Sequence, residues 1–278
     1  ALSDSTMQAW LVESDVDIAT IGLFSLVGLP YVLKFLWAPV LDRFQLKWLS
    51  RRRDWIIFSQ LVIAILLFAA SEYVDAHQNT VLLGIVAFLI AFASATQDIA
   101  VDAYRAEILL SRERGMGAGV SVAGYRIGML LSGAGAFVLA DQIGFSATYA
   151  VMGGFMLLAT TASIFGPPIQ AEMTPPQTLA AAIAEPLKNY FDRRAAITIL
   201  FLVVLYKLGD AFAGRLTTTF LLRGLEFSLT DVGTVNKGLG LAASIFGALY
   251  GGFLMFRIGM YRALMYFAIL QAVTNLGF

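Results

Sequence analysis

The chain has 278 residues, of which 59% are hydrophobic and only 14% are charged. Soluble globular proteins are nearer about 45–50% apolar and about 25% charged, so this composition excludes an ordinary soluble enzyme or binding domain. The formal net charge is zero and there is no cysteine, which excludes a disulfide framework and a thiolate metal site.

Long apolar runs account for the composition, and several reach the ~20 residues that a helix needs to cross a bilayer. We predict spanning helices at the following ranges: the outgoing end of a first helix at 1–11, then 18–41, 55–71, 80–104, 116–140, 146–165, 196–222, 232–256 and a helix from residue 260. Membrane-spanning β-strands would alternate apolar and polar residues, and these runs do not. The predicted fold class is an all-α polytopic membrane protein.

The helix at 116–140 is rich in glycine. Its glycines are Gly117, Gly119, Gly124, Gly128, Gly133 and Gly135. Small residues at such spacings let the backbones of two membrane helices approach each other closely, so we expect this helix to pack tightly against a neighbour.

A segment at residues 167–195 differs from the rest of the chain. Two proline pairs interrupt helices there, and residues 177–191 alternate apolar and polar side chains at helical spacing. We predict a cytoplasmic linker with a short amphipathic helix that lies on the membrane surface. The linker would separate an N-terminal half at 1–166 from the start of a C-terminal half at 196–278.

Basic side chains gather in alternate loops. The loops after the second, fourth, sixth and eighth predicted helices hold Arg43, Lys47, Arg51, Arg52, Arg53, Arg105, Arg112, Arg114, Lys188, Arg193, Arg194, Arg257 and Arg262, whereas the other loops hold only Arg223. Positively charged loops stay on the cytoplasmic side of a membrane, so these four loops are predicted to be cytoplasmic.

Two short segments repeat along the chain. Residues 6–11 resemble residues 217–222, and residues 19–22 resemble residues 230–233. Six predicted helices separate the copies, which indicates two six-helix halves related by duplication. Major-facilitator transporters have this architecture, with the binding site between the halves near the membrane midplane.

The helix at 80–104 acquires carboxylates before it leaves the apolar region. Asp98, Asp102 and Arg105 are spaced i, i+4 and i+7, so they share one helical face. A charge inside a bilayer is costly and usually faces a partner or a water-filled cavity, which indicates a helix that lines a transport path. At ~1.5 Å per residue, Lys34 and Asp98 each lie roughly 10 Å inside the cytoplasmic boundary, so they would pair if their helices adjoin.

The loop after the second helix resembles the basic motif of major-facilitator proteins. Asp42 and Arg43 are followed by three arginines at 51–53, with Pro39 in place of the usual glycine and a longer spacing. The chain also resembles the muropeptide permease (AmpG) family, in stretches at residues 26–39, 94–99, 125–130, 205–212 and 235–237. Members of that family have twelve or more spanning helices, so we expect this chain to run from the end of helix 1 through part of helix 9.

The resemblance implies proton-coupled import of N-acetylglucosaminyl-anhydromuramyl peptides across the inner membrane of a Gram-negative bacterium. We expect a monomer in the lipid bilayer, with a sugar-peptide substrate and protons as partners. We expect no cofactor, no metal and no nucleic-acid partner. Asp98 is the predicted proton-coupling residue.

The candidate substrate-binding residues are polar or charged side chains in or near the spanning helices: Lys34, Gln97, Tyr125, Arg126, Lys207, Asp210, Asn236 and Lys237. Lys34, Arg126 and Lys207 would attract peptide carboxylates. Gln97, Tyr125, Asn236 and Lys237 would bind sugar hydroxyls and amides. The alternative is that two fixed structural pairs exist, Lys34 with Asp98 and Lys207 with Asp210.

Four charged residues near the predicted cytoplasmic boundary are candidates for a gate: Asp42, Arg43, Asp102 and Arg105. For Asp102 and Arg105, the alternative is a salt bridge at the end of the helix.

Two further functions stay open from the sequence. One is a membrane-embedded sugar or lipid transferase, although Asp98 and Asp102 lie on a helix without histidine. The other is a carrier of a different substrate, such as acetyl-CoA.

Overall fold

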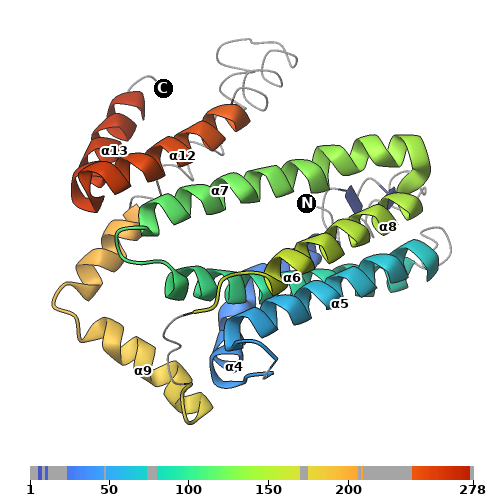
Figure 1. Cartoon of the computed structure of the whole chain (residues 1–278), viewed down its shortest axis with the longest axis horizontal. Coiled ribbons are helices and arrows are strands. Elements are labelled where there is room, and N and C mark those ends of the chain that lie inside the picture. Colours follow the sequence, from blue (N-terminus) through green and yellow to red (C-terminus); the bar gives the residue numbers. More distant parts are fainter. Residues whose placement is uncertain are drawn as a thin grey trace. The chain divides into compact units, whose positions relative to one another are not determined.

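The computed structural model describes residues 6–7, 10–11, 24–46, 48–73, 80–169, 175–205, 208 and 240–275. Every regular element within these ranges is a helix (Figure 1). Four stretches are long and apolar enough to cross a membrane: Arg51–Glu72, Val81–Ile108, Arg114–Ile164 and Gly240–Ile258. The described residues therefore confirm the prediction of an all-α, multi-pass membrane protein.

The chain divides into two compact units. One comprises Ala1–Ser111 and Ile127–Leu179, and the other comprises Arg112–Arg126 and Ala180–Phe278. The helix α7 (Arg114–Leu130) contributes residues to both units.

Three long helices build the first unit. α5 (Arg51–Tyr73) packs along both α6 (Thr80–Ile108) and α8 (Ala136–Ile164) (Figure 1). Alanines and larger apolar residues fill the space between the helices, including Ile63, Leu67, Ala87, Ile90, Ala91, Tyr149 and Met152. Because small residues let membrane helices approach closely, α5 and α6 can bring their polar residues into direct contact as well.

The segment before α5 forms four short helical pieces. They are η2 (Phe24–Gly28), α3 (Leu29–Leu33), η3 (Lys34–Leu36) and α4 (Ala38–Arg43). Prolines stand in the first turns of α3 and α4, where the missing N–H is tolerated, but in a single long helix each would break the ladder. Within the range predicted as one helix, residues 24–41 thus form a broken helix, in which Lys34 begins the 3-10 turn η3.

Helix boundaries near the basic loops differ from the prediction. α5 begins at Arg51, four residues before the predicted start, so the three arginines at 51–53 form its first turn. α6 begins at Thr80 as predicted but continues to Ile108. Both extensions place charged side chains inside helices, where they contact partners of opposite charge.

The two predicted helices at 116–140 and 146–165 are joined with almost no loop. α7 continues through a π-helical turn, η4 (Leu131–Gly135), directly into α8. The break falls at Gly144, which has φ 80° and ψ 162°. Glycine adopts positive φ without the steric cost that a Cβ would impose, so one residue replaces the predicted loop.

The second unit contains the remaining helices. α9 (Leu179–Phe191) lies inside the predicted linker and contains Pro186, which confirms a helix there, while its place on the membrane surface stays a prediction. A short apolar helix covers Ala196–Leu205. α12 (Gly240–Ile258) packs against α13 (Met260–Asn275) after a turn at Gly259, close to the predicted boundary.

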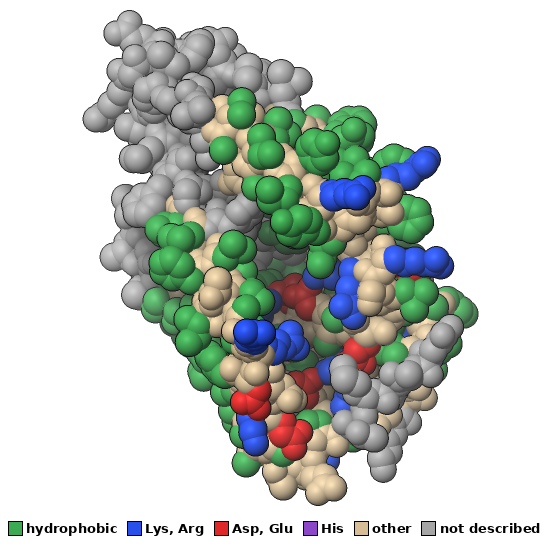
Figure 2. Space-filling model, turned by 90° about the vertical axis from the view of Figure 1, so that its left-hand side faces the viewer, with side chains coloured by type: hydrophobic (Ala, Val, Ile, Leu, Met, Phe, Trp, Pro, Cys, Tyr) green, Lys and Arg blue, Asp and Glu red, His purple; other side chains and the backbone are tan. Residues whose placement is uncertain are grey.

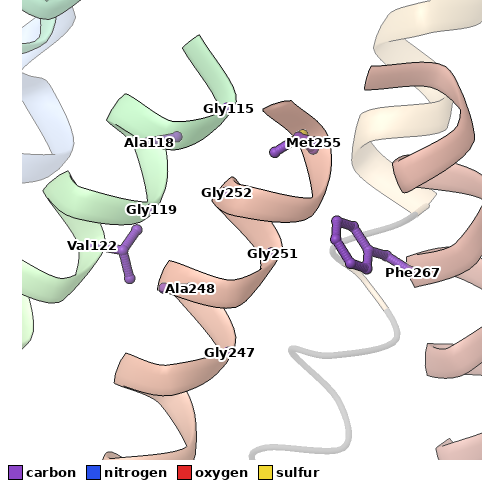
Figure 3. Close-up of a pocket in the computed structure, with 10 residues that line it drawn as sticks. All are labelled: Gly115, Ala118, Gly119, Val122, Gly247, Ala248, Gly251, Gly252, Met255 and Phe267. Atoms are coloured by element: carbon purple, nitrogen blue, oxygen red, sulfur yellow. The ribbon is translucent and has the colours of Figure 1, made fainter. Parts of the chain in front are cut away.

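Glycines allow α7 to cross α12 at very short range (Figure 3). A Cβ on Gly252 would lie 2.8 Å from the carbonyl oxygen of Gly115, and a Cβ on Gly119 would collide with the carbonyl oxygen of Ala248. Beside the crossing is an almost wholly apolar cavity of about 290 Å³, whose wall includes Phe267. The expected tight packing of this glycine-rich helix is confirmed at Gly119, whereas Gly124 and Gly128 have nothing within 4 Å of an added Cβ.

Replacing Gly119 by alanine is expected to destabilise the protein by about 1–3 kcal/mol, because the added methyl group overpacks the crossing. Gly124 lies on the same helix with nothing within 4 Å of an added Cβ, so Gly124→Ala should instead add about 0.5–1 kcal/mol through its better helix propensity. Reversible unfolding in mixed micelles measures both changes. Equal effects for the two substitutions would contradict the close crossing.

Candidate functional site

An ion pair joins the broken helix to α6 within the membrane-spanning region. The ammonium group of Lys34 donates to the Oδ2 carboxylate oxygen of Asp98, so the pairing predicted from helical depth is confirmed. Asp98 lies ten residues before the end of α6 at Ile108, or ~15 Å along a helix. The side chains are 32% and 47% exposed, respectively, so the pair is accessible as well as neutralised.

Two neutral hydrogen bonds flank the ion pair along the same contact. The hydroxyl of Tyr31 donates to Ser94 Oγ at 2.6 Å, and Trp37 Nε1 donates to Thr96 Oγ1 at 3.1 Å. The Trp37 ring also packs against Phe92, with 4.7 Å between ring centroids. These contacts fix the broken helix against α6 on both sides of the ion pair and form a polar seam between two apolar surfaces.

At the centre of this polar seam, the charges of Lys34 and Asp98 depend on each other. An unpaired charge within a bilayer is costly, so neither partner of the Lys34–Asp98 pair can be neutralised without affecting the other. A proton on Asp98 would remove the attraction and leave the ammonium in need of another anion.

A second charged cluster lies where α5 begins and α6 ends. Arg52 donates to Glu107 Oε1 from Nε and Nη2, each at 2.7 Å, and to Asp42 Oδ1 from Nη1 at 2.6 Å. Arg51 Nη1 donates to the carbonyl oxygen of Asp42 at 3.0 Å, and its Nη2 lies 3.7 Å from Glu107. The side chain of Glu107 is only 5% exposed, so this cluster is a buried network with Arg52 at its centre.

The third arginine of this turn holds the end of another helix. Arg53 is buried and donates to the carbonyl oxygens of Ser163 and Ile164, the last two residues of α8. A cation at a helix C-terminus complements the helix dipole and satisfies carbonyls that lack intrahelical partners. Nearby, the hydroxyl of Tyr104 donates to the carbonyl oxygen of Pro167 at 2.7 Å, so the chain leaving α8 is fastened to α6.

The predicted gate residues fall into different contacts. Asp42 joins the Arg52 cluster, whereas the Arg43 guanidinium lies 5.7 Å over the ring of Phe44. Asp102 accepts a 2.9 Å hydrogen bond from Arg105, three residues later, at a well-exposed position. Sequence analysis did not single out the pair of Arg52 and Glu107. The signal that could have found it is that both charged residues lie next to an end of an apolar helix, where an opposite charge on a neighbouring helix can neutralise each of them.

The other predicted site residues are distributed as follows. Gln97 is partly exposed on α6. Tyr125 and Arg126 lie on α7 in the second unit, where Tyr125 is exposed and the Nε of Arg126 is buried without a hydrogen-bond partner among the described residues. Lys207, Asp210, Asn236 and Lys237 lie outside the described residues.

Charged side chains of both signs lie among hydrophobic ones on the face drawn in Figure 2. Within the part of the chain that the structure describes, no three His, Cys, Asp or Glu side chains gather as a metal site would require.

Comparison with known proteins adds the family. The sequence model described as Major Facilitator Superfamily matches residues 4–278. The anhydromuropeptide permease of Escherichia coli (strain K12) is 45% identical over 279 residues, which cover 100% of this chain and 57% of that protein. The chain thus spans little more than half the length of this relative.

More distant relatives agree. An uncharacterized protein of Haemophilus influenzae is 38% identical, over 98% of this chain and 65% of its own length. The putative transporter AmpG 4 of Rickettsia conorii is 32% identical, over 99% of this chain and 68% of its own length. With its apolar spanning helices and these whole-chain matches, the chain belongs to the Major Facilitator Superfamily of membrane transporters and, within it, to the AmpG family.

Proposed function

We propose that the protein imports anhydromuropeptides across the bacterial inner membrane together with protons. The observation that carries the substrate is the 45% identity, over the whole chain, to a protein named anhydromuropeptide permease. The observation that supports proton coupling is the accessible Lys34–Asp98 pair within the spanning region.

The proposed architecture is that of two six-helix halves. Residues 1–166 supply the N-terminal half, residues 167–195 form a cytoplasmic linker, and residues 196–278 begin the C-terminal half. The substrate would bind between the halves near the midplane, as in other transporters built from repeats. Alternating access would then expose this chamber to one side of the membrane at a time, with the protein acting as a monomer.

The proposed cycle starts from the ion pair. A proton that enters from outside binds the carboxylate of Asp98 and ends its attraction to Lys34. The ammonium then binds a carboxylate of the peptide, aided by Arg126 and Lys207. The sugar hydroxyls and amides bind Gln97 and Tyr125 on the N-terminal side, and Asn236 and Lys237 on the C-terminal side. After the chamber opens inward, the peptide and the proton leave and the pair forms again.

The Asp42–Arg52–Glu107 cluster has a separate proposed role as part of a cytoplasmic gate. It gathers at the end of α5 and α6 that carries the basic loop, which the distribution of positive charge assigns to the cytoplasm. Ionic contacts that either form or break as a whole suit an element with two states. The exposed Asp102–Arg105 pair would lie at the rim of this gate.

Counterflow in proteoliposomes tests the substrate without needing a proton gradient. Vesicles loaded with unlabelled anhydromuropeptide should transiently accumulate labelled anhydromuropeptide from outside, whereas vesicles loaded with acetyl-CoA should not, and protein-free vesicles serve as the blank. If labelled acetyl-CoA accumulates in vesicles loaded with unlabelled acetyl-CoA while labelled anhydromuropeptide does not exchange, the protein is a carrier of acetyl-CoA instead. Absence of exchange with both ligands would contradict the proposed substrate.

A further inference from the structure

The loop that joins α4 to α5 exposes large apolar side chains. Phe44, Trp48 and Leu49 are 50%, 58% and 53% exposed. The same loop contains Lys47, which lies outside the described residues, and follows Arg43. Exposed aromatic residues beside cations are typical of segments that lie in the interface between lipid and water.

Side chains in the first turns of α5 bind backbone groups of this loop. The carboxylate of Asp54, which is wholly buried, accepts hydrogen bonds from the backbone N–H groups of Trp48, Leu49 and Ser50 at 2.9, 2.8 and 3.3 Å. Trp55 Nε1 donates to the carbonyl oxygen of Phe44 at 2.9 Å. The backbone at Phe44, Trp48 and Leu49 is thus held by hydrogen bonds, which lowers the entropic cost of binding a surface through their exposed side chains.

The position of the loop follows from the helix that it precedes. The spanning stretch of α5 begins at Arg51, three residues after Trp48, so the loop lies at the boundary of the bilayer. Arg51, Arg52 and Arg53 turn inward to partners within the protein. Arg43, in contrast, makes no ion pair with the described residues, and its guanidinium lies over the Phe44 ring.

We propose that Arg43, Phe44, Trp48 and Leu49 form a membrane-surface anchor that binds anionic phospholipid. Phe44, Trp48 and Leu49 insert between headgroups, and the Arg43 guanidinium binds a lipid phosphate. This surface is separate from the ion pair and from the transported substrate. It sets the height of the broken helix in the bilayer, because that helix enters the loop directly.

Depth-dependent fluorescence quenching tests the anchor. The protein is placed in nanodiscs whose lipids carry bromine either near the headgroup or near the chain end, and the signal of Trp48 is obtained as wild type minus Trp48→Phe. Trp48 should be quenched most by bromine near the headgroup. Trp10, buried in the core of the same unit, provides the matched control through Trp10→Phe and should be quenched by neither lipid.

Two outcomes would overturn the insertion of the loop. Quenching of Trp48 by aqueous acrylamide alone would place the loop in water, and protection from both quenchers would mean that protein covers it. The anionic component is tested by comparing anionic with zwitterionic nanodiscs. Quenching should be stronger in anionic lipid, and Arg43→Gln should remove that difference; equal wild-type quenching in both lipids would refute phosphate binding.

Discussion

Asp98→Asn is expected to abolish the accumulation of anhydromuropeptide while leaving counterflow exchange intact. Asparagine keeps the size of the side chain but cannot take up and release a proton. A gradient of one pH unit supplies about 1.4 kcal/mol per coupled proton, enough for about tenfold accumulation. Accumulation in proteoliposomes with an imposed pH gradient should therefore fall from about tenfold to none.

Asp102→Asn is the matched control for this result. Asp102 lies one turn further along α6, is 51% exposed and pairs with Arg105 at the rim of the proposed gate. Its substitution can therefore change the rate of transport, but it should leave the final pH-driven accumulation unchanged. The double variant Lys34→Gln with Asp98→Asn should recover any stability lost through the unpaired ammonium but not the accumulation. Substrate-dependent proton uptake that persists in Asp98→Asn would show that the coupling residue is elsewhere.

Glu107→Gln is expected to have the largest effect on stability. The substitution leaves two buried arginines, Arg51 and Arg52, with Asp42 as the one remaining carboxylate of the cluster, so one positive charge is no longer compensated. Removing one partner from a buried ion pair costs about 3–5 kcal/mol, because the remaining charge stays desolvated. The free energy of unfolding, measured by steric trapping in bicelles, should fall by this amount.

The comparison variant is again Asp102→Asn. Exposed ion pairs contribute about 0–1 kcal/mol, so loss of the bond between Asp102 and Arg105 should change the free energy of unfolding little. If Glu107→Gln and Asp102→Asn lower the free energy of unfolding by similar amounts, the cluster around Arg52 contributes no more to stability than an exposed ion pair does.

The helices and the central ion pair could be predicted from the sequence because both depend on local rules. The apolar length of a membrane helix is set by the bilayer, so the start of α6 at Thr80 and the boundary between α12 and α13 agree closely with expectation. The rise per residue is fixed, so counting from one boundary placed Lys34 and Asp98 at the same depth.

The buried cluster of Asp42, Arg52 and Glu107 could not be predicted from the sequence, for a physical reason. Sequence patterns treat charges at a helix end as solvated loop residues, so the prediction began α5 after its arginines and ended α6 before Glu107. The partners of Arg52 come from residues 10 and 55 positions away along the chain. Only the packing of α4, α5 and α6 reveals that these charges neutralise one another.

The broken helix illustrates a similar limit. Pro30 stands in the first turn of α3, but the sequence did not show that the break in the helix would leave Lys34 in a 3-10 turn facing α6. The turn depends on contacts with α6, including the bond between Trp37 and Thr96. Tertiary contacts thus determine which side chain the kink presents.

The central claim is that substrate binding and protonation of Asp98 occur together. Infrared difference spectroscopy measures this directly, since a protonated carboxyl group absorbs apart from a carboxylate. Addition of anhydromuropeptide to the wild-type protein in lipid should produce a protonated-carboxyl band that Asp98→Asn lacks. Substrate binding without such a band, or the same band in Asp98→Asn, would contradict the account.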